Sequence, residues 1–96
     1  MRNADYIIIG AGSAGCVLAE RLSAGGRDRV LVLEAGGSDQ RFWIKTPVGY
    51  GRTFADAAVN WKYQTLPNEN LGGRTMYWPR GRVVGGSSSI LSLIHI

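Results

Sequence analysis

Two short apolar runs and one amphipathic segment stand at the beginning of the chain. Residues 6–9 (Tyr-Ile-Ile-Ile) and 30–33 (Val-Leu-Val-Leu) are uninterrupted apolar runs, which is typical of parallel strands covered on both faces. Between them, residues 13–24 carry apolar side chains at helical spacing, and Gly25-Gly26 ends the pattern. The pattern predicts a βαβ unit over residues 4–34 with a right-handed crossover. The helix stripe expected to pack on the sheet consists of Gly15, Leu18, Ala19 and Leu22.

The pattern changes after Glu34. Glycine and proline punctuate residues 35–90, aromatic residues are interspersed, and only residues 53–59 have a briefly helical pattern. A nicotinamide-type domain would continue here with a second helix and a third apolar strand, which the pattern does not contain. Compact domains rarely carry so long an irregular stretch unless it is functional. We therefore expect an α/β fold, a truncated Rossmann-like βαβ domain whose long irregular segments lie along a large bound cofactor.

The turn between the first strand and the helix carries the motif G-x-G-x-x-G, formed by Gly10, Gly12 and Gly15. The first glycine permits a sharp turn, the second permits a pyrophosphate to come close, and the third permits helix and strand to pack closely. The helix then presents free N–H groups and a partial positive charge to the phosphates. Glu34 follows Gly15 by 19 residues, where an acid that binds a ribose belongs. The alternative is a glycine-rich turn that binds nothing, with Glu34 only a charge at a strand end.

A second glycine-rich stretch lies at residues 80–90 (Arg-Gly-Arg-Val-Val-Gly-Gly-Ser-Ser-Ser-Ile). Its paired glycines permit a nest of backbone N–H groups, and its serines add hydrogen-bond donors and a helix N-cap. The alternative is a capped turn without a ligand, and composition alone does not choose between the two.

The chain has 96 residues and a formal net charge of +4, which suits one small domain with a modest core. Lys and Arg are enriched in the second half. They are scattered among glycines, prolines and aromatics, so we prefer a solvated loop surface to a nucleic-acid interface. A more specific interpretation places Arg74, Arg80 and Arg82 near an anionic cofactor. Cys16, the single cysteine, is expected to be a packed residue, and no histidine cluster predicts a metal site.

No signal peptide is visible, and no segment approaches the ~20 apolar residues that cross a bilayer. A cytoplasmic protein is the default expectation, and peripheral membrane association of the full-length parent protein stays open. The sequence predicts no oligomeric state.

Four stretches of the chain resemble the GMC (glucose–methanol–choline) oxidoreductases, most nearly their bacterial choline-dehydrogenase-like branch. The matching stretches agree in order and spacing over residues 4–90. They are DYIIIGAGSAGCVLAERLS from residue 5, LEAGG at 33–37, NWKYQTLPN at 60–68 and GGRTMYWPRGRVVGGSSSI at 72–90. The resemblance implies a parent protein that binds FAD through its amino-terminal βαβ unit and oxidises a small-molecule alcohol at its CH–OH group.

The resemblance also implies which residues contact FAD. The pyrophosphate would be lined by the first turn, the adenosine ribose would be held by Glu34, and Ala35 would lie beside the adenine. The second stretch would run near the flavin and its phosphates, and Trp61 is a weaker candidate for a wall around the nucleotide. The cofactor residues implied are Gly10, Gly12, Ser13, Ala14, Gly15, Glu34, Ala35, Trp61, Arg80, Gly81, Val84, Gly85, Gly86, Ser87 and Ser88.

The chain departs from the family pattern at residue 91. Residues 91–96 (Leu-Ser-Leu-Ile-His-Ile) look foreign, and we interpret residues 1–90 as a partial FAD-binding domain. The family's catalytic histidine lies further along the polypeptide, so no catalytic residue is assigned here, and His95 is not expected to be a base. The 96-residue chain itself is expected to be inactive. Two alternatives are a non-catalytic nucleotide-binding module and a fragment of an NAD-dependent dehydrogenase.

Overall fold

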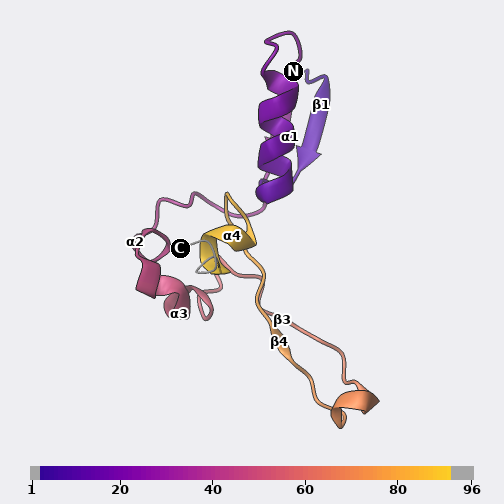
Figure 1. Cartoon of the computed structure of the whole chain (residues 1–96), viewed down its shortest axis with the longest axis vertical. Coiled ribbons are helices and arrows are strands. Elements are labelled where there is room, and N and C mark those ends of the chain that lie inside the picture. Colours follow the sequence, from indigo (N-terminus) through magenta and orange to yellow (C-terminus); the bar gives the residue numbers. More distant parts are fainter. Residues whose placement is uncertain (1–2, 92–96) are drawn as a thin grey trace.

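The computed structural model describes residues 3–91. Its first part is a βαβ unit made of β1 (Tyr6–Ile9), α1 (Ser13–Ser23) and β2 (Val30–Leu33), which lies at the upper end of the molecule in Figure 1. The two strands pair in parallel along all 4 residues of each. The predicted βαβ unit is confirmed.

Helix α1 packs closely on β1 because Gly15 has no side chain. A Cβ at Gly15 would lie 2.0 Å from the carbonyl oxygen of Gly10, so glycine is required at this contact. At the other end of the helix, Gly26 adopts φ +65° and donates its N–H to the Ser23 carbonyl at 2.9 Å. The glycine pair therefore ends the helix as predicted.

Only one face of the β1–β2 sheet is covered by the described chain. Ile8 faces α1 and is 9% exposed, whereas Ile7 and Ile9 are 61% and 87% exposed. The prediction of strands covered on both faces is therefore not met within residues 3–91. Leu18, expected in the packed helix stripe, is 52% exposed, because two strands are too narrow to reach it.

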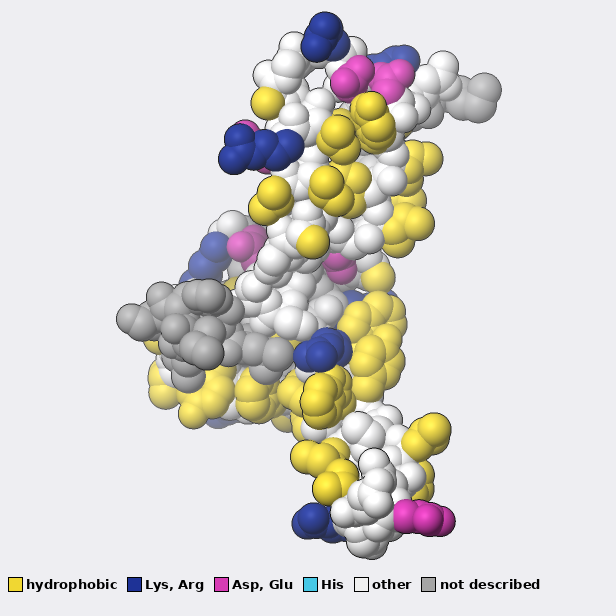
Figure 2. Space-filling view, turned by 45° about the vertical axis from the view of Figure 1, so that its right-hand side comes forward, with side chains coloured by type: hydrophobic (Ala, Val, Ile, Leu, Met, Phe, Trp, Pro, Cys, Tyr) yellow, Lys and Arg dark blue, Asp and Glu magenta, His cyan; other side chains and the backbone are white. Residues whose placement is uncertain are grey.

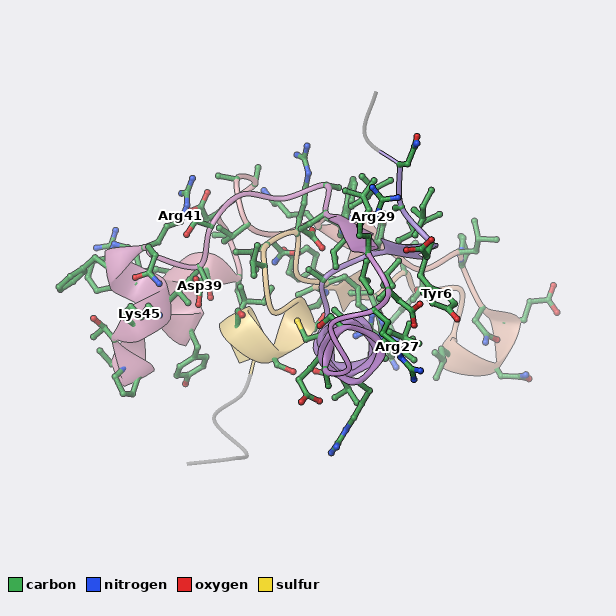
Figure 3. All side chains as sticks on the ribbon, turned by 90° about the horizontal axis from the view of Figure 1, so that it is seen from above. Tyr6, Arg27, Arg29, Asp39, Arg41 and Lys45 are labelled. Carbon is green, nitrogen blue, oxygen red and sulfur yellow. The ribbon has the colours of Figure 1, made fainter. Side chains whose placement is uncertain are left out.

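The chain between residues 42 and 53 consists of short helical turns. They are α2 (Phe42–Lys45), η1 (Pro47–Gly49) and α3 (Tyr50–Thr53). The prediction of helix over residues 53–59 is wrong, because α3 ends at Thr53 and most of the residues after it form turns. Helices of one turn are too short to produce a periodic pattern. Figure 3 shows Asp39, Arg41 and Lys45 beside α2, where Lys45 Nζ lies 3.3 Å from Asp39 Oδ2.

A narrow antiparallel hairpin projects from the middle of the molecule to its lower end in Figure 1. It consists of β3 (Tyr63–Gln64) and β4 (Tyr77–Trp78), with η2 (Glu69–Leu71) near its tip. The N–H of Asn70 donates to the side chain of Asn68 at 2.9 Å and caps η2. The sequence did not predict this hairpin, because strands of two residues show no alternation.

The main buried cluster joins the end of the chain to its middle. Helix α4 (Ser87–Leu91) contributes Ile90, which packs with Val59 and Val83, and Ile44 packs against them. The molecule is elongated, with a radius of gyration of 16.4 Å and extents of 53 × 32 × 26 Å, against about 13 Å for a compact chain of about 100 residues. In residues 3–91, no helix is long and apolar enough to span a bilayer.

Candidate functional site

The first glycine turn leaves donors and space at the beginning of α1. Gly10 adopts φ +98° and donates its N–H to the Leu33 carbonyl at 2.7 Å, so the turn is held to the end of β2. A Cβ at Gly12 would meet no atom within 4 Å. Cys16 is the first residue of the helix whose N–H is bonded, to Gly12 O at 2.9 Å. The N–H groups of residues 13–15 have no backbone acceptor among the described residues, as an anion site at a helix N-terminus requires.

Glu34 lies at the end of β2 and joins this turn to the turn that follows the strand. Its Oε2 accepts the N–H of Ala11 at 2.8 Å, and its Oε1 accepts the N–H of Gly36 at 2.9 Å. The carboxylate is half-buried, and Ala35 beside it is exposed. Two N–H donors occupy only part of the capacity of a carboxylate, which can accept about four hydrogen bonds.

The second glycine turn docks directly on the first. Gly85 donates its N–H to Ala11 O at 2.7 Å. A Cβ at Gly86, where φ is +65°, would lie 2.9 Å from Gly12 Cα. The hydroxyl oxygens of Ser13 and Ser88 lie 2.7 Å apart and share a hydrogen bond. Two stretches distant in the sequence therefore form one surface.

The turn after β2 completes this surface. Gly37 forms a parallel bridge with Val83 and accepts the N–H of Val84 at 3.0 Å. A Cβ at Gly36 would lie 2.0 Å from the carbonyl oxygen of Arg82. We call the three adjoining segments, residues 10–15, 34–37 and 81–88, the three-turn site.

The paired glycines use their own N–H groups inside the protein. Gly85 donates to Ala11, and Gly86 donates to Val83 O at 2.8 Å, so neither N–H is free for the nest that the sequence permits. Ser87 is at the start of α4, and its hydroxyl accepts the N–H of Gly81 at 3.0 Å. These groups therefore shape the site rather than offering it donors.

Two of the predicted residues, Trp61 and Arg80, lie beside the three-turn site, and Val84 lies within its third segment. Trp61 is 43% exposed and stacks on Tyr63 with ring centroids 5.9 Å apart. The guanidinium of Arg80 lies 5.3 Å from the centre of the Trp78 ring. The N–H of Trp61 donates to Arg80 O at 2.9 Å, next to the pairing of β3 with β4, so both residues belong to the base of the hairpin. Val84 is 40% exposed. The segment that contains Arg74 is at the far end of the hairpin in Figure 1, so the structure separates Arg74 from the three-turn site.

Arg82 differs from the other two predicted arginines. Its guanidinium lies 4.9 Å from the centre of the Trp61 ring, and its Nε is buried without a hydrogen-bond partner in the described part of the chain. An unpaired buried donor is costly. Its position next to Gly36 fits an anionic group near the three-turn site.

Asn60 supports the three-turn site from outside its three segments, and the sequence did not indicate this residue. It is 2% exposed. Its Oδ1 accepts the N–H groups of Lys62 at 2.9 Å and Arg80 at 3.1 Å, and its Nδ2 donates to Phe54 O at 3.0 Å. The buried amide therefore fixes the backbone that leads into the second glycine turn. No periodicity marks such a residue, because its role depends on partners distant in the sequence.

Other chemistry is sparse in the described residues. Cys16 is exposed, not packed as predicted, and its Sγ lies 3.3 Å from Ala11 O. Within residues 3–91, no group of three or more His, Cys, Asp or Glu side chains could hold a metal ion. His95 and the rest of residues 92–96 lie outside the described residues, and the foreign origin of the tail at residues 91–96 stays a prediction.

The chain was compared with known proteins. The family model described as "GMC oxidoreductase" matches residues 4–96. The chain is 49% identical over 92 residues to "Oxygen-dependent choline dehydrogenase" of Photobacterium profundum, covering 96% of this chain and 16% of that protein. It is 50% identical over 92 residues to "Alcohol dehydrogenase [acceptor]" of Pseudomonas putida, covering 96% and 17%. The chain thus spans about a sixth of the length of the curated relatives it matches.

Solved structures share this fold. Pyridoxine 4-oxidase from "Mesorbium loti" superposes with a TM-score of 0.84 at 37% identity, covering 95% of this chain and 18% of that one. A structure named "FAD-dependent oxidoreductase from Chaetomium thermophilum" gives a TM-score of 0.76 at 31% identity, covering 96% and 15%. The α/β fold class is confirmed, and the match over residues 4–96 shows that the chain belongs to the GMC oxidoreductase family.

Proposed function

We propose that the three-turn site is the FAD-binding part of an oxidoreductase that acts on the CH–OH group of an alcohol. The single observation that carries the proposal is the junction of the G-x-G-x-x-G turn, Glu34 and the second glycine turn. Membership of the GMC oxidoreductase family and relatives named choline dehydrogenase and alcohol dehydrogenase support an alcohol of the choline type as substrate. The name of a structural relative supports FAD as the cofactor.

The residues fit an anionic dinucleotide. The unbonded N–H groups at the beginning of α1 and the positive end of its dipole suit a pyrophosphate. The open space above Gly12 lets phosphate oxygens come close to the backbone. Glu34 keeps acceptor capacity for ribose hydroxyls, and the guanidinium of Arg82, whose Nε has no hydrogen-bond partner within residues 3–91, adds a positive group nearby. The remaining predicted residues that would line the cofactor are Gly10, Ser13, Ala14, Gly15, Ala35, Trp61, Arg80, Gly81, Val84, Gly85, Gly86, Ser87 and Ser88.

Bound FAD would supply the two-electron redox chemistry, while the protein supplies binding, orientation and electrostatics. In this chain, α1 would neutralise phosphate charge, Glu34 would orient the adenosine, and the second turn would exclude water from the phosphates. We assign no catalytic base to residues 3–91.

The test uses the full-length parent protein. We expect it to be purified with a stoichiometric flavin whose absorption band bleaches under anaerobic conditions on addition of choline or a simple primary alcohol. Its apoprotein should bind FAD far more tightly than NAD in parallel titrations. Preferential binding of NAD would support the dehydrogenase-fragment alternative. FAD binding without bleaching by any alcohol would support a non-catalytic nucleotide-binding module.

A further inference from the structure

Glu34 forms hydrogen bonds with two of the three segments that make up the three-turn site. Its two carboxylate oxygens accept the N–H groups of Ala11 at 2.8 Å and Gly36 at 2.9 Å. Ala11 stands between the first two glycines of the motif, and Gly36 stands in the turn after β2. The carboxylate therefore connects the two turns directly, in addition to the bond from Gly10 N–H to Leu33 O and the contacts that both turns make with the second glycine turn.

Both ends of this connection contact the second glycine turn. Ala11 donates its backbone N–H to Glu34, and its carbonyl oxygen accepts the N–H of Gly85 at 2.7 Å. At the other end, Gly36 is in close contact with the backbone of Arg82. Displacement of the Glu34 carboxylate would therefore disturb all three segments.

The energetic argument concerns the N–H groups that Glu34 satisfies. Ala11 is only 6% exposed, so its N–H would have little access to water if the carboxylate were removed. Hydrogen bonds to a charged acceptor are stronger than neutral ones, and a buried donor left unpaired is costly. A site that is ordered in advance avoids the entropic cost of ordering its loops when the ligand binds.

We propose that Glu34 is a positioning residue that pre-forms the cofactor site, in addition to any contact with the adenosine ribose. This inference rests on the proposed function, because the ligand concerned is FAD. It differs from a ribose contact in one testable respect. If the carboxylate organises the site, its removal should also lower the affinity for a ligand that has no ribose hydroxyl groups.

The test titrates the apoprotein of the full-length parent with FAD and with an FAD analogue whose adenosine ribose lacks its 2′- and 3′-hydroxyls. The variant is Glu34→Gln, which keeps the side-chain shape but can accept only one of the two N–H bonds. The matched control is Glu20→Gln, because that carboxylate is on the exposed face of α1 and its side chain is 66% exposed. We expect Glu34→Gln to lower the affinity for both ligands by a similar factor, about 10- to 100-fold. The control should change neither affinity.

The inference is overturned if Glu34→Gln lowers the affinity for FAD but leaves the affinity for the analogue without ribose hydroxyls unchanged, since Glu34 would then act only through the ribose. Failure of the proposed function gives a different result, in which the unsubstituted apoprotein binds neither ligand.

Amide hydrogen exchange of the unsubstituted protein tests the inference even if the Glu34→Gln variant does not fold. In the unsubstituted apoprotein, we expect the N–H groups of Ala11 and Gly36 to exchange at least about 10-fold more slowly than unbonded loop amides. In a folded Glu34→Gln variant, at least one of the two should lose this protection, while the amides in the middle of α1 keep theirs. Exchange of both amides at open-loop rates in the unsubstituted apoprotein would refute a pre-formed connection.

Discussion

At the scale of single residues, the site depends on positions where backbone meets backbone. A Cβ at Gly15 would lie 2.0 Å from Gly10 O, and one at Gly86 would lie 2.9 Å from Gly12 Cα. Backbone atoms cannot rotate away as the end of a flexible side chain can. A methyl group at either position must therefore separate the segments that the contact joins.

The first prediction concerns Gly15→Ala. The added methyl group would push α1 away from the turn after β1, and we expect the free energy of unfolding of the full-length protein to fall by about 1–3 kcal/mol. FAD affinity should fall with it, because the helix N-terminus moves from the phosphates. Urea denaturation and FAD titration measure the two effects.

Gly25→Ala is the matched control, because a Cβ there would meet nothing within 4 Å and Gly25 has no positive φ. Equal effects of the two substitutions would show that the close packing of α1 on β1 is not what Gly15 provides.

At the scale of elements, short segments are held by specific hydrogen bonds more than by buried area. The second glycine turn is fixed on one side by the first turn and on the other by the base of the hairpin, where Asn60 accepts the N–H of Arg80. Its hydrophobic anchor is small, consisting of Val83 and Ile90 packed with Val59. Loss of one polar contact should therefore be felt across the site.

The second prediction concerns Gly86→Ala. The substitution would place a Cβ against Gly12 at a backbone φ of +65°, which costs roughly 1–2 kcal/mol for a residue with a side chain. We expect FAD affinity to fall by about 10-fold or more, because the second turn must withdraw from the first. Isothermal titration of the apoprotein measures this.

Gly51→Ala serves as the control, since a Cβ there would lie in open space on α3. An affinity unchanged in Gly86→Ala would mean that the two turns do not have to touch for the cofactor to bind.

The third prediction concerns Asn60→Asp, which conserves shape but replaces the donating amide by an acceptor. The new carboxylate oxygen would face the carbonyl of Phe54, now at 3.0 Å from Nδ2, in a place only 2% exposed. We expect a loss of about 2–4 kcal/mol in the free energy of unfolding, measured by urea denaturation.

Asn70→Asp, in the exposed η2 turn, introduces the same charge without burying it and should cost less than about 0.5 kcal/mol. Similar losses of unfolding free energy in the two variants would show that the hydrogen bonds of the Asn60 amide do not stabilise the fold.

At the scale of the whole molecule, the described chain exposes much apolar surface for its size. Figure 2 shows hydrophobic side chains over the upper βαβ unit, the middle and the hairpin. Ile7 and Ile9 on the open face of the sheet are 61% and 87% exposed, although parallel sheets occur almost only with both faces covered. The three-turn site is therefore held by hydrogen bonds and close backbone contacts between segments distant in the sequence, on a scaffold with a small core.

The fourth prediction concerns the 96-residue chain on its own. Ordering its long irregular segments costs roughly 1–2 kcal/mol per residue in backbone entropy, which so small a core does not offset. We expect no cooperative thermal transition, weak or no FAD binding by flavin fluorescence, and no alcohol-dependent bleaching. A stoichiometric yellow complex that choline reduces would contradict this prediction and show that the chain is an enzyme by itself.

The sequence alone determined the βαβ unit and the first glycine turn. The apolar runs, the helical spacing and the glycine motif are local patterns, because the periodicity of a strand or a helix involves residues close together in the sequence. The same dependence on neighbouring residues explains which elements the sequence did not predict. The helical turns at residues 42–53 and the hairpin are too short to show a period, and the exposure of Leu18 depends on how wide the sheet is.

Only the tertiary structure decided what the predicted residues do to one another. The sequence placed Glu34 near a ribose, but not in hydrogen bonds with Ala11 and Gly36. It permitted a nest of N–H groups at Gly85 and Gly86 without choosing it over a capped turn, whereas the N–H of Gly85 bonds Ala11 O, and it gave no sign of Asn60. These roles arise where segments distant in the chain meet, because a backbone N–H bonds whichever acceptor the fold brings within reach, and no local pattern records which one that is.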